Sequence, residues 1–282
     1  MRILITGGKG MLGRTLCRVL ANHTLTVSDL PETDITRPAA FDAAVQAAKP
    51  ELILHAAAMT AVDACESDPD QAFRVNALGS ACVARAAARA GARLIAFSTD
   101  YVFDGRLPRP YHEWDATDPQ SVYGASKKAG ETAVQTLCPN HLIIRIAWLY
   151  GPGGPSFLHT MRRLAATPGA PLRVVRDQVG NPTSTDAVAG LVRQLIDQPL
   201  IGGILHGSCE GDASWYEFAQ AIFRRFPAAR ALEPCTHEAF PRPAPRPANS
   251  RLEKRMLRLL GLPPMPDWRE ALDRFCHDHP DL

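Results

Sequence analysis

Lysine is scarce in this sequence of 282 residues, which holds 5 lysines against 26 arginines, and neither sign of charge is in excess. The 31 basic and 29 acidic residues leave a formal net charge of +2. Such a balance provides no electrostatic attraction to nucleic acid or to an anionic membrane surface. We therefore expect neither of them among the partners.

Paired cysteine motifs and long apolar runs are missing as well. The seven cysteines are scattered and none has C-x-x-C spacing, so the sequence predicts neither a disulfide framework nor a zinc site. No apolar run approaches the roughly 20 residues of a membrane helix. The first segment, "MRILITGG", reaches glycine too soon for a signal peptide. We expect a soluble cytoplasmic protein.

Apolar, β-branched segments alternate with helical patterns over the first 150 residues. We expect strands at 2–6, 25–29, 51–58, 93–99 and 141–151, and helices at 11–21, 41–49, 71–91 and 123–137. This alternation predicts an α/β fold, in which a doubly wound parallel sheet of Rossmann type forms a dinucleotide-binding domain over residues 1–150.

The pattern changes after Tyr150. "GPGGPS", "ATPGAPL" and the proline-rich "HEAFPRPAPRPANS" predict loops, while helical spacing persists over 185–198 and 215–226. We expect residues 151–282 to form mostly a smaller, substrate-binding lobe. One strand of this half, at about 203–208, is expected to return to the main sheet.

The segment "TGGKGMLG" carries glycines at G-x-x-G-x-x-G spacing between the first strand and the first helix. A turn without Cβ atoms lets backbone N–H groups approach a pyrophosphate at the positive end of the helix. The cofactor-binding residues predicted here are Gly7, Gly10, Met11, Leu12 and Gly13.

Acidic residues follow the second strand. A carboxylate in the place of Asp29 usually meets the ribose hydroxyls of the adenosine and disfavours a 2′-phosphate. Asp34, followed by Ile35, is a rival for contact with the adenosine, or Asp34 simply caps the next helix. NADH and NADPH both remain candidates.

Tyr123 and Lys127 stand four residues apart in "YGASK". In a helix this spacing places both side chains on one face. A phenol has a pKa of about 10, and an ammonium about 4 Å away lowers it by roughly 3, which makes proton transfer to a carbonyl effective. An exposed helix with an unrelated Tyr–Lys pair is the alternative.

Hydrogen-bonding side chains end the fourth strand, in "STDYVFDG". The carboxyl ends of parallel strands share the sheet edge where ligands bind. We therefore expect Ser98 and Thr99 beside Tyr123, with Asp100 holding a sugar hydroxyl, although Ser, Thr and Asp are also common in plain loops and caps.

Taken together, these motifs resemble the dTDP-4-dehydrorhamnose reductase family of extended short-chain dehydrogenases/reductases. The matching segments are "STDYVFDG", "AAAMTAVDACE", "YGASKKAGE", "DQVGNPT" and "RPANSRLEK", in the family's order. The resemblance spans residues 3 to about 255. It implies that NADPH or NADH reduces the 4-keto group of a nucleotide-linked 6-deoxy sugar, giving dTDP-L-rhamnose.

The resemblance also implies roles for residues. Tyr123 would protonate the C4 oxygen, and Lys127 would lower the pKa of Tyr123 and bind the nicotinamide ribose. Thr99 would polarise the carbonyl and Asp100 would orient the sugar. The implied cofactor contacts further include Ser98, Asn76, Ala56, Ala57 and Ala58. The implied substrate contacts further include Tyr101, Trp148, Asn181, Pro182 and Thr183, with core packing as the alternative for Trp148.

The chain departs from the family pattern at two places. Ile146 and Ala147 stand where the family usually has Thr-Ser before the Trp, so polar contacts near the pocket are expected to be missing. Thr15 stands where some members carry a Glu used in metal-bridged dimers. We therefore predict no metal site, and a monomer or a homodimer.

Three alternatives stay open. The first is a reductase of another nucleotide-linked keto sugar. The second is a non-catalytic dinucleotide-binding subunit, like the regulatory subunit of methionine adenosyltransferase. The third is an epimerase or dehydratase that retains its NAD.

Overall fold

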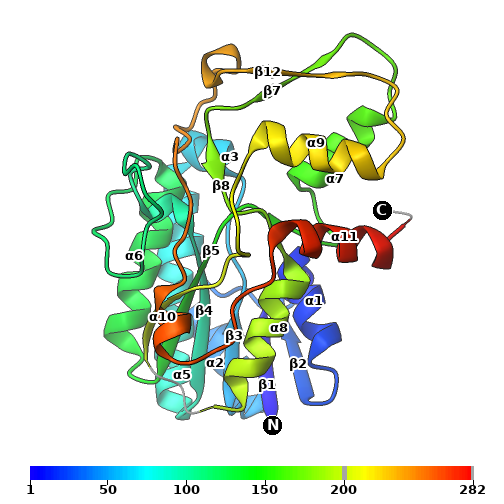
Figure 1. The fold of residues 1–282 in the computed structure, drawn as a ribbon. Coiled ribbons are helices and arrows are strands. Elements are labelled where there is room, and N and C mark those ends of the chain that lie inside the picture. The colour runs from blue at the N-terminus through cyan, green and yellow to red at the C-terminus, as the bar shows by residue number, and fades with distance from the viewer. Residues whose placement is uncertain (199–201, 281–282) are drawn as a thin grey trace.

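Six parallel strands form the central sheet of the computed structural model, which describes residues 1–198 and 202–280 (Figure 1). Their order is β10-β5-β4-β3-β1-β2. The strands are β1 (Arg2–Thr6), β2 (Thr24–Ser28), β3 (Leu52–His55), β4 (Arg93–Thr99), β5 (His141–Ile146) and β10 (Gly203–His206). The doubly wound Rossmann-type prediction is confirmed, and the direction of winding changes between β1 and β3, where such folds bind ligands.

Helices cover both faces of the sheet because successive strand residues point to opposite sides. Ile3 and Ile5 of β1 pack in one core with α1 (Met11–Val19) and α8 (Thr185–Ile196). Leu4, between them, packs in a second core. The helices of that second face are α2 (Pro38–Ala48), α5 (Ser80–Ala90) and α6 (Val122–Leu137).

The single helix expected at 71–91 consists of three pieces. These are α4 (Pro69–Phe73), a π-helical turn η1 (Arg74–Gly79) and α5. A further short helix, α3 (Val62–Ser67), precedes them and was not predicted. A π turn inside a helix is a rare feature that is frequent at functional sites.

The smaller lobe lies over the ends at which the parallel strands finish (Figure 1). Its helices are α7 (Phe157–Ala165), α9 (Trp215–Arg225) and α11 (Trp268–Asp278). Short strand pairs complete it: β7 (Leu172–Val175) with β12 (Leu232–Cys235), β8 (Val179–Gly180) with β11 (Ala213–Ser214), and β6 (Leu149–Tyr150) with β9 (Thr183–Ser184). Among the short helical elements, η3 (His237–Ala239) follows β12, whereas η2 (Asp100–Val102) follows β4 and α10 (Arg255–Leu259) packs in the core of the sheet domain.

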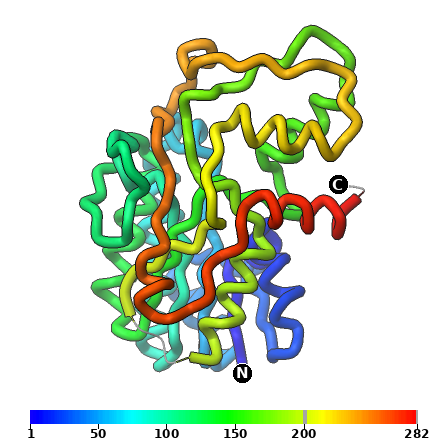
Figure 2. Tube along the Cα trace, in the orientation of Figure 1, coloured from blue at the N-terminus to red at the C-terminus, as the bar shows by residue number. Residues whose placement is uncertain are grey.

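The two halves of the chain interleave. Strand β10 pairs in parallel with β5, and α8 packs on α1, although both β10 and α8 follow residue 150. The segment between β12 and α10 runs from the smaller lobe back to the sheet (Figure 2). It forms β-bridges from Asn249 to Val179 and from Leu252 to Tyr111. Positions 199–201 and 281–282 of the expected second lobe lie outside the described residues.

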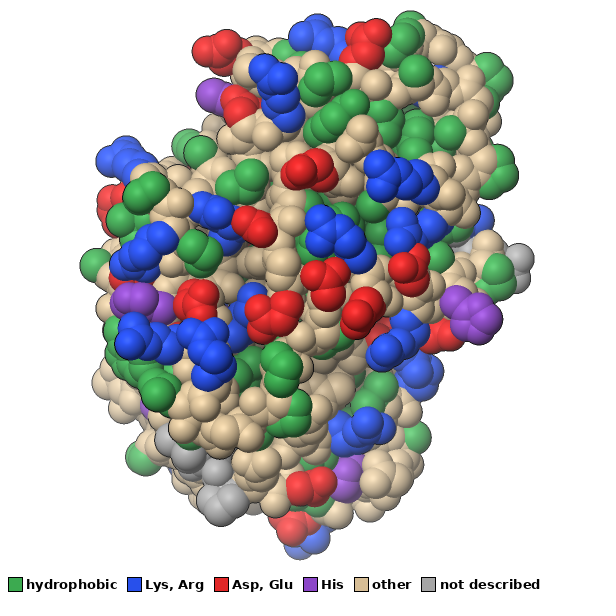
Figure 3. All heavy atoms as spheres, viewed as in Figure 1, with side chains coloured by type: hydrophobic (Ala, Val, Ile, Leu, Met, Phe, Trp, Pro, Cys, Tyr) green, Lys and Arg blue, Asp and Glu red, His purple; other side chains and the backbone are tan. Residues whose placement is uncertain are grey.

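The surface carries both signs of charge. Lys, Arg, Asp and Glu side chains are interspersed over the face seen in Figure 3, including the region between the two lobes. Among the described residues, no helix has the length and apolar character needed to cross a membrane.

Replacing Gly13 by Ala is expected to destabilise the fold. A Cβ there would lie 2.2 Å from the Gly7 carbonyl oxygen, so backbone must move. Overpacking of this kind costs about 1–3 kcal/mol of unfolding free energy. Urea unfolding measures the loss.

Gly190→Ala is the matched control, because a Cβ at this position of α8 meets no atom within 4 Å. The control should gain about 0.5–1 kcal/mol from the better helix propensity of Ala. A Gly13→Ala protein as stable as the wild type would contradict the close approach.

Candidate active site

The glycine turn packs so closely that it has no room for side chains. Gly7 has a φ of +67°, and a Cβ on it would lie 2.6 Å from the Ala57 nitrogen. Gly10 is the N-cap of α1 and provides no side-chain cap. The first N–H groups of α1 are therefore free to bind an anion.

A cavity of about 360 Å³ lies between this turn, the end of β4, helix α6 and the segment after β5. It brings together fourteen of the predicted site residues. They are Gly7, Gly10, Met11, Leu12, Gly13, Ala56, Ala58, Ser98, Thr99, Asp100, Tyr101, Tyr123, Lys127 and Trp148. The predicted cofactor side and the predicted substrate side thus share one cavity.

Seven lining residues were missed by the sequence analysis. They are Thr60, Val62, Phe97, Ile146, Ala147, Leu149 and Pro155. Thr60 and Val62 belong to the segment "AAAMTAVDACE", so that motif carried the signal. Ile146 and Ala147 are the apolar replacements noted above, and they face the cavity directly.

Asp29, Asp34 and Ile35 lie outside this cavity. The carboxylate of Asp29 accepts hydrogen bonds from the backbone N–H of Lys9 (2.7 Å) and Leu30 (2.8 Å). Asp29 therefore fastens the glycine turn to the end of β2. Asp34 accepts from the N–H and hydroxyl of Thr36, both at 2.8 Å, and Ile35 is buried in the core.

Asn76 and Ala57 support the cavity from behind. The Asn76 side chain is buried, accepts from the Met59 N–H (2.8 Å) and donates to the Met59 carbonyl (3.1 Å) and the Ser126 hydroxyl (3.0 Å). It therefore ties the alanine-rich loop to α6. Ala57 packs against Gly7.

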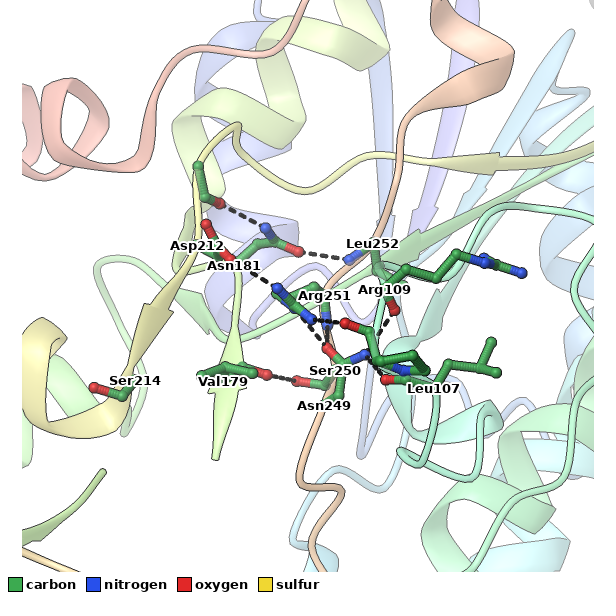
Figure 4. A network of polar contacts seen from close by, with 12 residues as sticks. Leu107, Arg109, Val179, Asn181, Asp212, Ser214, Asn249, Ser250, Arg251 and Leu252 are labelled. Carbon is green, nitrogen blue, oxygen red and sulfur yellow. Dashed lines mark hydrogen bonds and ion pairs between the residues drawn. The ribbon is translucent and has the colours of Figure 1, made fainter. Parts of the chain in front are cut away.

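The Asn181–Pro182–Thr183 turn is not part of the lining of this cavity. All three residues are buried. The Asn181 amide donates to the Gly211 carbonyl (2.6 Å) and accepts from the Leu252 N–H (2.7 Å), as Figure 4 shows. The Thr183 hydroxyl donates to the Asn181 carbonyl (2.9 Å). The turn anchors the returning segment through the hydrogen bond between Asn181 and Leu252.

Helix α6 presents Tyr123 and Lys127 to the cavity, and Ser121 caps its first turn. The Lys127 ammonium donates to the Phe97 carbonyl at 2.8 Å, and burial lowers the pKa of Lys127 to about 8, with Glu131 opposing the shift. Burial raises the pKa of Tyr123 well above 10, and the Thr99 hydroxyl opposes that rise. The pKa of Tyr123 is thus raised by burial, and is not lowered as expected from Lys127.

Asp100 is buried at the end of β4 and accepts from the Thr99 hydroxyl at 3.0 Å. Burial raises the pKa of Asp100 to about 7, although the hydroxyls of Ser250 and Thr99 lower it. Tyr101 lies edge-on to the Tyr123 ring, with the ring centroids 5.4 Å apart.

Trp148 lies between the sheet domain and the smaller lobe. Its ring lines the cavity and packs both against the apolar cluster of the smaller lobe and against a cluster around Phe103 and Tyr111. Its backbone has a φ of +47°, a conformation that bulky residues rarely adopt. Its Nε1–H donates to the Ser250 hydroxyl at 2.9 Å.

A glycine turn on a Rossmann sheet, with Tyr, Lys and Thr in the adjoining cavity, defines an oxidoreductase of the dehydrogenase/reductase class. The comparisons with known proteins place it further. The family model described as "RmlD substrate binding domain" matches residues 1–279, and the chain belongs to this family.

Two relatives and one solved structure illustrate the similarity. A probable dTDP-4,6-dihydroxy-2-methyloxan-3-one 4-ketoreductase of Streptomyces antibioticus is 43% identical, over 99% of this chain and 98% of that one. The dTDP-4-dehydrorhamnose reductase of Mycolicibacterium smegmatis is 42% identical, over 96% and 84%. The crystal structure of the Bacillus anthracis dTDP-4-dehydrorhamnose reductase in complex with NADP is 38% identical, covers 98% and 99%, and has a TM-score of 0.95.

Asp100→Asn is expected to change how stability depends on pH. A buried carboxyl whose pKa rises from 3.8 to about 7 stabilises the fold fully below pH 4 and loses that contribution as the pH rises to about 7. The wild type should therefore lose up to about 4 kcal/mol over this interval through this group.

The amide cannot ionise, so the variant should lack this loss. Urea unfolding of both proteins at pH 4 to 8 measures the difference, which should grow with pH in favour of Asn. A constant difference would show that Asp100 does not titrate in this range.

Proposed function

We propose that the protein reduces the 4-keto group of dTDP-4-dehydrorhamnose to give dTDP-L-rhamnose, with NADPH or NADH. The observation that carries the proposal is the shared cavity, in which Tyr123, Lys127 and Thr99 adjoin the glycine turn. The relatives named for this reaction, at 42% identity over nearly the whole chain, support it.

The glycine turn and α1 are suited to hold the pyrophosphate of the cofactor, because Gly7, Gly10 and Gly13 leave backbone N–H groups accessible. Ala56 and Ala58 leave space beside the turn. When bound, the nicotinamide supplies the hydride.

Tyr123 is the proton donor in this proposal. A phenol, with an ordinary pKa of about 10, is protonated at neutral pH, as a donor to the C4 oxygen must be. The Thr99 hydroxyl, next to Tyr123, polarises the same oxygen. Lys127, fixed on the Phe97 carbonyl, offers its ammonium to the ribose of the cofactor. Asp100 orients the sugar hydroxyls.

A second candidate is the 4-keto reduction of another dTDP-linked deoxysugar. The 43% identity to the probable 4-ketoreductase of Streptomyces antibioticus favours it. The roles of Tyr123, Lys127 and Thr99 would be the same. We further propose that the protein works in the cytoplasm, as a monomer or homodimer, on a nucleotide-sugar substrate.

Tyr123→Phe tests the proposal through the loss of NADPH or NADH absorbance on adding dTDP-4-dehydrorhamnose. The wild type should oxidise at least one cofactor steadily. Without the phenolic proton the variant should lose about two orders of magnitude in kcat. Its affinity for the cofactor, measured by titration calorimetry, should stay within about twofold, since only the hydroxyl is removed.

Tyr216→Phe, in the apolar cluster of the smaller lobe, is the matched control and should keep wild-type turnover. Steady turnover by Tyr123→Phe would exclude Tyr123 as the proton donor. Cofactor binding without oxidation by the wild type would contradict the reduction of dTDP-4-dehydrorhamnose and would favour either another nucleotide-linked keto sugar or the non-catalytic alternative.

A further inference from the structure

Trp215 and Trp148 are stacked face to face where the two lobes meet. Their ring centroids are 3.4 Å apart and the planes differ by 2°. Trp148 follows β5 of the sheet domain, whereas Trp215 is the first residue of α9 in the smaller lobe. Aromatic pairs left to themselves prefer offset or edge-on arrangements, so the surrounding structure holds this sandwich in place.

Trp215 is held in place by neighbouring residues of the smaller lobe. Ser214 caps α9 and forms a reciprocal capping box with Glu217, which fixes the first turn of the helix. Phe157 of α7 lies on Trp215, with the centroids 4.5 Å apart. Trp215 is thus braced by two helices of the smaller lobe.

Trp148 has little freedom of its own. Its φ of +47° is a strained conformation that only the surrounding contacts can maintain. The Ser250 hydroxyl accepts a hydrogen bond from the Nε1–H of the ring. Gly180 packs against this Nε1 edge so closely that a Cβ would lie 2.4 Å from the ring. Trp148 therefore lines the cavity while its ring lies on Trp215.

We infer that Trp215 is a positioning residue for substrate binding: it backs the Trp148 indole and so fixes the cavity wall on which the sugar of the substrate rests. A flat, rigid indole suits the apolar face of a deoxysugar better than a mobile one, because no rotamer freedom is lost when the sugar binds. The inference rests on the proposed function for the identity of that sugar.

Trp215→Ala is the main test. The KM for dTDP-4-dehydrorhamnose should rise by about tenfold, because an aromatic pair contributes up to about 1.5 kcal/mol beyond its buried area. The kcat and the Kd for NADPH should change less than about threefold, since the proton donor and the glycine turn are untouched. Trp215→Phe should restore most of the KM. Gly180→Ala, whose Cβ would press on the Nε1 edge of the ring, should raise the KM like Trp215→Ala.

Phe223→Ala is the control for loss of lobe stability. Phe223 lies two turns further along α9, in the apolar cluster of the lobe. It should lower the Tm of the protein without raising the KM. An equal rise in KM in Phe223→Ala, or no rise in Trp215→Ala, would overturn the inference.

A second readout needs no substrate. The background is Trp114→Phe, because Trp114 is 58% exposed and would be quenched in every variant. In this background Trp215→Ala and Trp215→Phe both retain only Trp148 and Trp268. Trp268 is 1% exposed. Acrylamide should quench the tryptophan fluorescence of the Ala variant more strongly than that of the Phe variant, because Trp148 then has no aromatic ring stacked on it. Equal quenching would contradict the role of Trp215. If the wild type does not reduce the substrate, the proposed function fails. The comparison of fluorescence quenching between Trp215→Ala and Trp215→Phe still shows whether Trp215 holds Trp148 in place.

Discussion

The site depends on the close contact of Gly7 with Gly13 and with the loop after β3. At both glycines a Cβ would lie within 3 Å of backbone atoms, the Ala57 nitrogen and the Gly7 carbonyl respectively. This contact brings the start of α1 to the switch point of the sheet, where the strand ends open a crevice. Asp29 then fastens the turn from the β2 side through the Lys9 N–H.

The positions of Tyr123 and Lys127 depend on a second set of close contacts, those of helix α6. A Cβ on Gly124 would lie 2.1 Å from the Tyr101 carbonyl, and one on Gly130 would lie 2.4 Å from the Asn76 carbonyl. The helix therefore lies directly against η2 and the π turn. Tyr123 reaches Thr99 and Tyr101 for this reason, and Lys127 reaches the Phe97 carbonyl. The positions of these side chains therefore follow from backbone contact.

The sequence predicted the features that arise from local pattern. The strand–helix alternation indicated the sheet, and the glycine spacing and the Tyr–Lys spacing indicated the residues that meet in the cavity. It did not predict the π turn at 74–79, because Ala-rich helical spacing is the same on either side of such a turn. Nor did it predict that the Asn181 amide is used by Gly211 and Leu252, since these partners lie 30 and 71 residues away in the chain. The burial that sets the pKa values of Tyr123 and Lys127 is likewise a property of tertiary packing.

The central claim is that a carbonyl group of the substrate receives, in one cavity, a hydride from the cofactor on its carbon and a proton from the protein on its oxygen. Transfer of deuterium tests it most directly, with NADPH or NADH labelled on the reacting face of C4 of the nicotinamide and dTDP-4-dehydrorhamnose as acceptor. The account predicts a dTDP-rhamnose product that carries deuterium at C4 of the sugar, as seen by NMR. A product without the label at C4, or a labelled cofactor that binds but keeps its deuterium, would contradict it.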